Sequence, residues 1–229
     1  MTSLQKWGKS VRTTIPVMAG YLVLGAGFGI LLRTRGYGLG WALAMSAFIY
    51  AGSMQYVAID LLTGGASLLT TAVTTLLVNA RHLFYGISML ERYRAAGKYA
   101  PYLIFSLTDE TYSLVAARED LTGAECFRIS LLDQLYWVLG TALGSLAGAY
   151  LDFNTTGIDF SLTALFLTVF TEQWLEMKDH APALIGLGVS IVCRLLFGAD
   201  SFLLPTMGGM LCCLLVLDAR RTKKGGESV

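Results

Sequence analysis

The chain has 229 residues, of which 55% are hydrophobic and only 14% are charged, and its mean hydropathy is +0.59. Soluble domains carry about 25% charged residues, so this composition predicts an integral membrane protein. The net charge of +1 and the pI near 7.6 give no basic footprint for nucleic acid, because the basic residues fall in loops and tails. Nucleic-acid binding is therefore excluded as a function.

The first hydrophobic run, residues 15–32, follows three basic residues and so imitates a signal peptide. The run is longer than the core of such a peptide and more hydrophobic segments follow, which predicts that it is the first retained span. The cysteines match no disulfide or metal-ligand spacing, and neither a metal nor a cofactor is expected. They are Cys126, Cys193, Cys212 and Cys213.

Eight hydrophobic segments predict a single transmembrane domain over residues 1–229. Residues 1–118 hold most of the polar motifs, 119–219 are expected to form helical hairpins, and 220–229 a basic cytoplasmic tail. Several segments are shorter than the ~20 apolar residues that a helix needs to cross a bilayer, so not all of them need span. The segments are 15–32, 37–59, 66–90, 100–117, 131–151, 158–175, 181–197 and 202–217.

The second and fourth segments carry small or polar residues at their centres. Residues 51–55 interrupt the second segment, and the stretch from Ser106 to Glu110 interrupts the fourth. Interrupted segments in corresponding halves are typical of a transporter's binding site. The predicted fold is therefore an all-α polytopic membrane protein with about six spanning helices plus two interrupted or re-entrant segments.

The positions of lysine and arginine separate two topologies, because these residues favour short cytoplasmic loops. If all eight segments span, ten basic residues lie inside and five outside. If the second and fourth segments are re-entrant, thirteen lie inside and two outside, which fits the rule better. The re-entrant topology would also relate the first two segments to the next two as an inverted repeat. Both topologies place the N and C termini in the cytoplasm.

The third segment, 66–90, carries Asn79, Arg81 and His82 near its middle. A guanidinium at bilayer depth costs about 2.5 to 3.5 kcal/mol on insertion scales, so it persists where protein or water surrounds it. This placement predicts a polar site or pathway. On a straight helix Asn79 and His82 share a face and Arg81 points away from it.

The motifs of the first 118 residues resemble the AzlC family, the large subunit of bacterial branched-chain amino acid exporters, and the rest of the chain resembles it in hydropathy. The residues that carry the resemblance are Pro16 and Gly20 with 25–29, Ala51-Gly52-Ser53-Met54-Gln55, Asn79-Ala80-Arg81-His82, and Pro101 through Leu107-Thr108-Asp109-Glu110.

The resemblance implies efflux of leucine, isoleucine, valine and sometimes methionine through the bacterial inner membrane, in a complex with a small hydrophobic AzlD-type subunit. The sequence departs from the family pattern at Thr111-Tyr112, where the family often has serine-phenylalanine. That departure leaves the preferred side-chain size open.

A zwitterionic amino acid needs partners for its carboxylate and its ammonium, together with an apolar pocket for its side chain. The backbone N–H groups of Gly52 and Ser53 at a half-helix N terminus are candidates for the carboxylate, because that end of a helix favours anions. Gln55 and Asn79 could add polar contacts, and Arg81 could bind the carboxylate bidentately. Two structural alternatives stay open: Gly52 permits close helix packing, and Arg81 forms a buried ion pair.

Asp109 and Glu110 are candidates for proton coupling, because burial disfavours the charged carboxylate. Adjacent residues on a helix differ by about 100°, so at most one of them faces the same cavity as Ser53, and Asp109 is preferred. His82 could relay protons. In the structural alternatives, Thr108 or Asp109 caps a half-helix and His82 is a hydrogen-bonded core residue.

Other functions are weaker readings of the same residues. A passive channel, a transporter for another small polar metabolite, or a scaffold could share the interrupted segments. An intramembrane hydrolase would need an activated nucleophile, and neither G-x-S-x-G nor H-E-x-x-H occurs, so no enzyme is predicted. Trp137, Tyr150 and Trp174 are expected near segment ends, as interfacial anchors.

Overall fold

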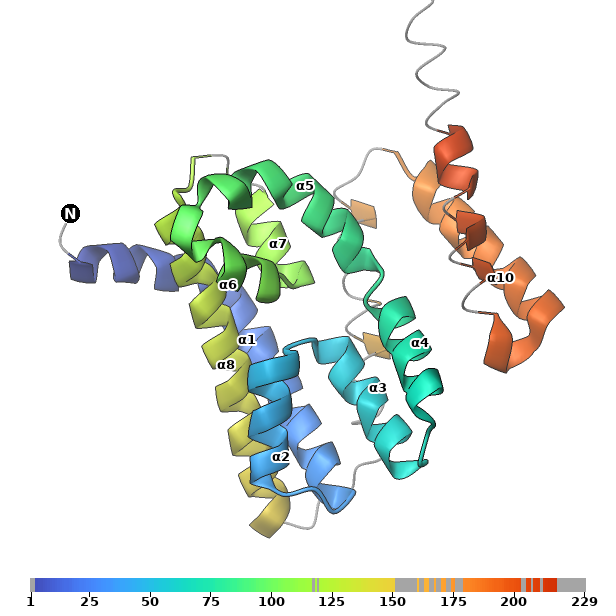
Figure 1. The fold of residues 1–229 in the computed structure, drawn as a ribbon, viewed down its shortest axis with the longest axis horizontal. Coiled ribbons are helices and arrows are strands. Elements are labelled where there is room, and N and C mark those ends of the chain that lie inside the picture. Colours follow the sequence, from blue (N-terminus) through green and yellow to red (C-terminus); the bar gives the residue numbers. More distant parts are fainter. Residues whose placement is uncertain are drawn as a thin grey trace, which may run out of the picture. The chain divides into compact units, whose positions relative to one another are not determined.

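In the computed structural model, every regular element among the described residues is a helix (Figure 1). The description covers residues 3–116, 118, 120–150, 160, 163–164, 167, 170–171, 174–175, 179–202, 205–206, 208–210 and 212–217. The chain forms two compact units, Met1–Thr163 and Ala164–Val229. The all-α prediction is confirmed for the described part of the chain, whereas the single domain over 1–229 stays a prediction.

The first unit contains most of the helices, and α10 lies in the second. Their bounds are α1 Ser3–Thr34, α2 Leu39–Ala44, the π-helix η1 Met45–Ile49, α3 Gly52–Thr63, α4 Leu68–Val78, α5 Arg81–Ala95, the 3-10 helix η2 Gly97–Tyr99, α6 Ala100–Phe105, α7 Asp109–Ala116, α8 Gly123–Tyr150 and α10 Ala181–Ser201.

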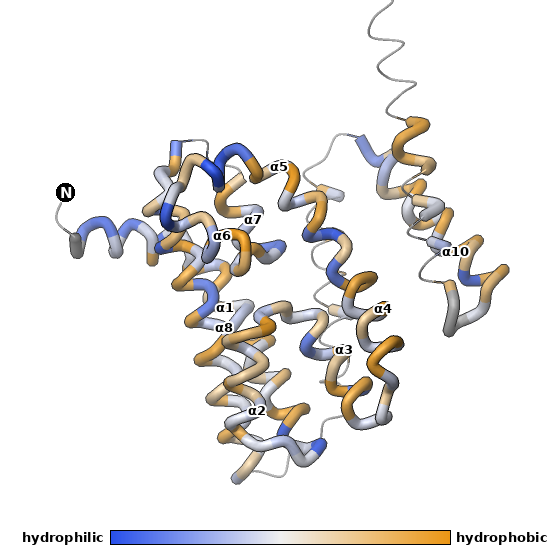
Figure 2. The backbone as a smooth tube through the Cα atoms, in the orientation of Figure 1, coloured by the Kyte–Doolittle hydropathy of each residue, from blue (hydrophilic) through white to orange (hydrophobic). Residues whose placement is uncertain are grey.

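Two helices in the described residues, Gln5–Thr34 and Ala181–Gly198, are long and apolar enough to cross a membrane. Figure 2 shows apolar stretches along α4 and α10 and hydrophilic colouring at the start of α1. The number of spans stays a prediction. The 152–159 loop and the basic tail 220–229 lie outside the described residues, as do parts of the sixth and eighth segments.

Helices α1 and α8 pack along each other through glycines spaced four residues apart. A Cβ on Gly29 would lie 2.3 Å from the Thr141 carbonyl oxygen, and one on Gly144 would lie 2.0 Å from the Ala26 carbonyl oxygen. Only glycine permits this approach of the two backbones, as in small-residue packing between transmembrane helices. The pair α1–α8 therefore forms the rigid centre of the first unit (Figure 1).

Trp137 lies in the core of this unit and is only 4% exposed. Its ring packs edge-on against Tyr21 and stacks on Phe28, with centroids 5.4 and 6.4 Å away. The prediction of an interfacial anchor is wrong for this residue, because α8 begins at Gly123, well before the apolar segment, and Trp137 falls at its middle. Tyr150, at the last residue of α8, is 85% exposed, as an anchor would be.

The second and fourth segments are broken where the sequence indicated. The second breaks between η1 and α3 at Tyr50, which is left-handed with φ 43°, and the fourth breaks between α6 and α7 after Ser106. Figure 1 shows α2 running up to its break and α3 returning from it, so that the pair forms a hairpin. Helices α6 and α7 flank the other break, and we expect this pair to form a second hairpin.

The third segment is broken as well, which the sequence analysis did not expect. Helix α4 ends at Val78, Asn79 has φ −93° and ψ 2°, and α5 begins at Arg81. The sequence indicated breaks in the second and fourth segments and missed this one, because hydropathy averaged over a segment does not register a single capping residue. Asparagine side chains form hydrogen bonds with nearby backbone groups, so asparagine is common at helix ends.

The first turns of α1, the start of α8 and the 91–99 stretch lie at one end of the first unit. Lys9 forms an ion pair with Glu125 at 3.7 Å. The Glu125 carboxylate also closes a capping box, because it accepts from the Thr122 backbone N–H and hydroxyl. These hydrogen bonds lower the pKa of Glu125. The ring of Tyr99 lies 5.0 Å from Phe127. The 91–99 stretch therefore lies at the same end as the first turns of α1 (Figure 1).

The other end carries the turn that joins α3 to α4. Ile59 belongs to the same buried cluster as Leu31 and Leu32, near the last turn of α1. Arg33 in that turn packs beside Gly148, close to the end of α8. The 63–65 turn and the 91–99 stretch thus lie at opposite ends of the unit. Both topologies place these two turns on opposite sides, and the end that 91–99 shares with the first turns of α1 is the feature that agrees with the re-entrant one. The re-entrant topology and the inverted repeat stay predictions.

Candidate functional site

Three helices of the first unit begin directly after the interruption of a hydrophobic segment. They are α3 at Gly52, α5 at Arg81 and α7 at Asp109. Ala51 and Ala80 precede α3 and α5 and supply no side-chain cap, so the first backbone N–H groups of these helices have no capping acceptor from that residue. Helix N termini carry partial positive charge and bind anions.

The Arg81 side chain joins these three N termini. Its Nη1 lies 2.8 Å from the Asp109 Oδ2, and its Nη2 donates to the Ser53 Oγ at 2.5 Å. The Arg81 and Asp109 side chains are 28% and 24% exposed, so the ion pair is not sealed. The structure therefore brings three of the predicted site residues together at one point, with Asp109 as the anion in that place.

An apolar groove of about 710 Å³ lies beside this ion pair, along α4, α5 and α6 and the break at Tyr50. Asn79 and His82 line the groove, whereas Arg81 does not. The His82 Nδ1 lies 3.1 Å from the Asn79 carbonyl oxygen. The buried Oδ1 of Asn79 has no hydrogen-bond partner within the described part of the chain, so it is available to a donor in the groove.

The Gly52 Cα and the Gln55 side chain face Trp137 and not the Arg81 cluster. A Cβ on Gly52 would lie 3.0 Å from the Trp137 ring, so a larger residue would require the ring to shift. The Gln55 Oε1 accepts from the Trp137 indole N–H at 2.9 Å, and its Nε2 donates to the Ser46 Oγ at 3.1 Å. Gln55 is fully buried, and the role in substrate binding predicted for both residues stays a prediction.

Glu110 faces a different set of groups from Asp109. The Tyr21 hydroxyl lies 2.7 Å from both the Glu110 Oε2 and the Thr108 Oγ1. Thr108 donates to the Thr111 Oγ1 at 3.1 Å, and Thr111 donates to the Asp133 Oδ2 at 2.8 Å. A continuous row of hydroxyls thus joins two carboxyl groups, one on α7 and one on α8.

Sequence reasoning missed Asp133 and Tyr21. The signal for Asp133 was present, because it is the only acid within the apolar segment 131–151, and an acid in such a segment marks a functional site by default. The cap predicted at Thr108 is present: its Oγ1 accepts from the Thr111 backbone N–H at 3.3 Å. Thr108 therefore caps α7 and also belongs to the row of hydroxyls.

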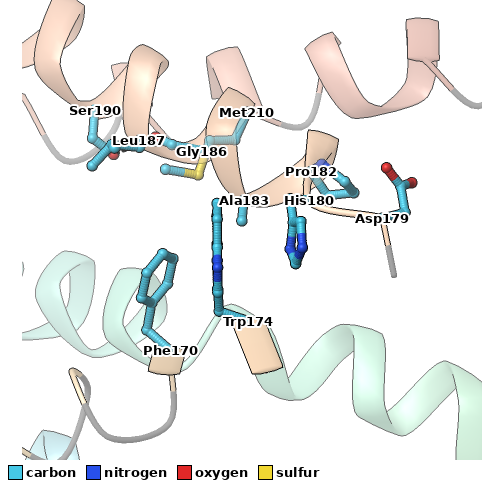
Figure 3. Close-up of a pocket in the computed structure, with 10 residues that line it drawn as sticks. All are labelled: Phe170, Trp174, Asp179, His180, Pro182, Ala183, Gly186, Leu187, Ser190 and Met210. Atoms are coloured by element: carbon cyan, nitrogen blue, oxygen red, sulfur yellow. Dashed lines mark hydrogen bonds between the residues drawn. The ribbon is translucent and has the colours of Figure 1, made fainter. Parts of the chain in front are cut away.

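The second unit contains a separate hollow of about 460 Å³ (Figure 3). Figure 3 shows the Trp174 ring between Phe170 and His180, and the Trp174 and His180 centroids are 4.1 Å apart with the planes inclined by 16°. Met210 and the small residues of α10 close the opposite wall. Among its described lining residues the hollow offers one carboxylate, Asp179, and no cation comparable to Arg81.

Interrupted apolar helices whose N termini meet around a charged cluster are typical of membrane transport proteins. A family model described as AzlC protein matches residues 16–151. The chain belongs to the AzlC family, as its motifs predicted, and it is a membrane transport protein.

Relatives cover most of the chain. The branched-chain amino acid transport protein AzlC of Bacillus subtilis (strain 168) is 46% identical over 209 residues, 89% of this chain and 82% of the relative. A membrane protein of Helicobacter pylori (strain ATCC 700392 / 26695) is 42% identical over 207 residues, 89% and 91% of the two chains. The inner membrane protein YgaZ of Escherichia coli (strain K12) is 26% identical over 222 residues, 90% and 87%. No solved structure matches.

Proposed function

We propose that the protein exports branched-chain amino acids from the bacterial cytoplasm in exchange for protons, by alternating access, as the large subunit of a complex with a small hydrophobic AzlD-type partner. The observation that carries the proposal is the Arg81–Asp109 ion pair at the meeting point of three helix N termini. The name of the Bacillus subtilis relative supports the class of substrate.

The substrate carboxylate binds where Asp109 now lies. Arg81 offers two N–H groups on one side of its guanidinium, held toward Ser53 and Asp109, and such a fork matches a carboxylate. The N termini of α3, α5 and α7 add the same electrostatic preference. Because a substrate carboxylate and the Asp109 carboxylate compete for one cation, protonated Asp109 is the form that releases Arg81 to the substrate.

The rest of the amino acid lies in the groove. Its walls are mostly aliphatic and aromatic, and they suit the side chain of leucine, isoleucine or valine. The Asn79 Oδ1 is a buried acceptor with no partner in the described structure and suits the substrate ammonium. The groove thus offers an apolar pocket for the substrate side chain and an acceptor for its ammonium, next to the Arg81 site that binds its carboxylate.

The coupling follows from this competition. A proton that arrives from outside neutralises Asp109, and Arg81 then binds the carboxylate of a substrate from the cytoplasm and releases it outside. Asp109 afterwards loses its proton to the cytoplasm and pairs with Arg81 again, so that one cycle carries one proton in and one amino acid out. His82 and Glu110 are the neighbouring groups through which the proton passes.

The outer surface of the first unit supports a membrane-embedded complex with both termini in the cytoplasm. Large apolar side chains on α4 and α5 are open, including Leu68, Leu69 and Phe84 at 90%, 75% and 56% exposure. Such a surface is stable only against lipid or an apolar partner. The basic residues of the N-terminal turns and of the 91–99 stretch lie at one end, as the cytoplasmic side requires.

The proposal is tested in proteoliposomes that contain the chain and its small partner. Asp109→Asn keeps the shape of the side chain but cannot take up a proton, so we expect leucine accumulation driven by a pH gradient to fall at least tenfold. Exchange of labelled for unlabelled leucine, which needs no net proton transfer, should continue. Asp60→Asn is the matched control, because Asp60 is an exposed carboxylate on α3.

Gradient-driven flux that is unchanged in Asp109→Asn would falsify Asp109 as the proton carrier. Leucine flux that neither saturates nor responds to the gradient would identify a passive channel instead.

A further inference from the structure

We propose that Glu110 and Asp133 form a second proton site, in which one proton is shared between the two carboxyl groups through the hydroxyls of Tyr21, Thr108 and Thr111. The inference deepens the proposed function, because it adds a place where the transported proton is held while Asp109 is bound to Arg81. It assigns a role to Asp133, which the competition at Arg81 does not use.

The geometry is a row of five oxygen atoms. From Glu110 Oε2 to Tyr21 Oη is 2.7 Å, from Tyr21 Oη to Thr108 Oγ1 is 2.7 Å, and from Thr108 Oγ1 to Thr111 Oγ1 is 3.1 Å. From Thr111 Oγ1 to Asp133 Oδ2 is 2.8 Å. Each separation is close to that of an O–H···O hydrogen bond.

The number of protons decides the charge of this row. Four contacts between oxygen atoms need four protons, and the three hydroxyls supply one each. If both carboxyl groups were ionised, one contact would join two oxygen lone pairs with no proton between them. One further proton, carried by Glu110 or by Asp133, fills all four contacts. The row therefore holds one more proton than its hydroxyls bring.

That proton moves without any side chain leaving its place. When it lies on Glu110, Glu110 donates to Tyr21, Tyr21 to Thr108, Thr108 to Thr111 and Thr111 to Asp133. Transfer breaks four O–H bonds and forms four: each oxygen gives its proton to the next, Glu110 becomes the carboxylate, and Asp133 becomes the acid. All four hydrogen bonds then point the opposite way.

The two ends of the row differ in their surroundings. Asp133 is fully buried, and its Oδ1 has no hydrogen-bond partner among the described residues. Glu110 is partly exposed and follows Asp109 directly on α7. Glu110 is thus the end at which a proton enters from the Arg81–Asp109 site, and Asp133 is the end at which it is held away from water.

Few other charged or titratable groups face the row. On the Glu110 side they are Tyr21 from α1, Tyr50 from the hairpin tip, Tyr85 from α5, and Asp109 and Arg81. On the Asp133 side they are Tyr50 and Tyr102, besides Glu110 itself. Arg81 is the single cation of this set, and it is already paired with Asp109. The charge of the row is therefore set by its own two carboxyl groups.

The first experiment removes the Thr111 hydroxyl, which joins Thr108 to Asp133. Thr111→Val keeps the shape but removes the hydroxyl, so gradient-driven leucine transport should fall at least tenfold, while leucine–leucine exchange stays within about twofold of the parent. Thr111→Ser restores the hydroxyl and should restore gradient-driven transport. Thr141→Val is the matched control: the Thr141 Oγ1 is another buried hydroxyl, which accepts from Ser46 and lies outside the row.

The second experiment observes the proton directly, in purified protein and without transport. Infrared spectra between pH 5 and pH 9 should contain the stretch of one protonated carboxyl that is lost in Asp133→Asn and shifted in Tyr21→Phe. If that band is present but transport proves independent of the pH gradient, the shared proton stands and the proposed coupling fails.

Two outcomes would overturn the inference. One is the absence of any carboxyl band that responds to Asp133→Asn or Tyr21→Phe. The other is an equal loss of gradient-driven transport and of exchange in Thr111→Val and Thr111→Ser, which would identify Thr111 as a structural residue.

Discussion

Arg81 is the residue at which the polar chemistry of the three broken segments meets. The sequence placed it in an apolar segment and left open whether it binds the substrate or pairs with an acid. The structure pairs it with Asp109 and Ser53 at the same time. Both roles can belong to Arg81 in turn, because a cation that exchanges one carboxylate for another is paired with an acid when no substrate is bound.

A substitution of Gln55 tests whether its side chain supports Trp137 or binds the substrate. Gln55→Leu leaves the buried Trp137 N–H without its acceptor, so we expect the free energy of unfolding to fall by about 1–3 kcal/mol. The measurement is thermal or denaturant unfolding in detergent. In the double variant with Trp137→Phe both partners are gone, and the loss should be smaller than the sum of the two single losses. Unchanged stability with weakened leucine binding would instead place Gln55 in the substrate site.

At the scale of elements, the contact between α1 and α8 depends on glycine. Gly144→Ala introduces a Cβ that would meet the Ala26 backbone, so the helices must move apart. We expect a cost of about 1–3 kcal/mol, measured as a lower unfolding midpoint in detergent. Gly20→Ala is the control, because nothing lies within 4 Å of a Cβ at Gly20. Equal midpoints for the two variants would contradict the close packing.

Two of the three helix breaks could be predicted from the local sequence. Polar residues at the centres of the second and fourth segments predicted their breaks, because several such residues lie together there. The break at Asn79 depends on one residue and was missed. The pairing of Gly29 with Thr141 and Ser145 joins positions more than a hundred residues apart, and the contact of Thr111 with Asp133 joins two different helices. Neither follows from periodicity within a segment.

At the scale of the whole molecule, the two hairpins decide which loops share a side. In a background without cysteine, Lys98→Cys should be protected from an impermeant thiol reagent added outside cells, and Thr63→Cys should react. The reason is that 91–99 lies at the same end as the first turns of α1, and the 63–65 turn at the other. The reverse pattern would restore a topology in which all eight segments span.

The break at Tyr50, the first turn of α5 and the first turn of α7 all lie beside one guanidinium. In the proposed re-entrant topology a hairpin from each side reaches this depth, so the insulating layer between the two solutions would be thin and most of the transmembrane voltage would fall across it. A charge that moves a short way at Asp109 then experiences nearly the full field, about 2.3 kcal/mol per 100 mV. The cell's electrical gradient, as well as its acidity gradient, would therefore drive the cycle.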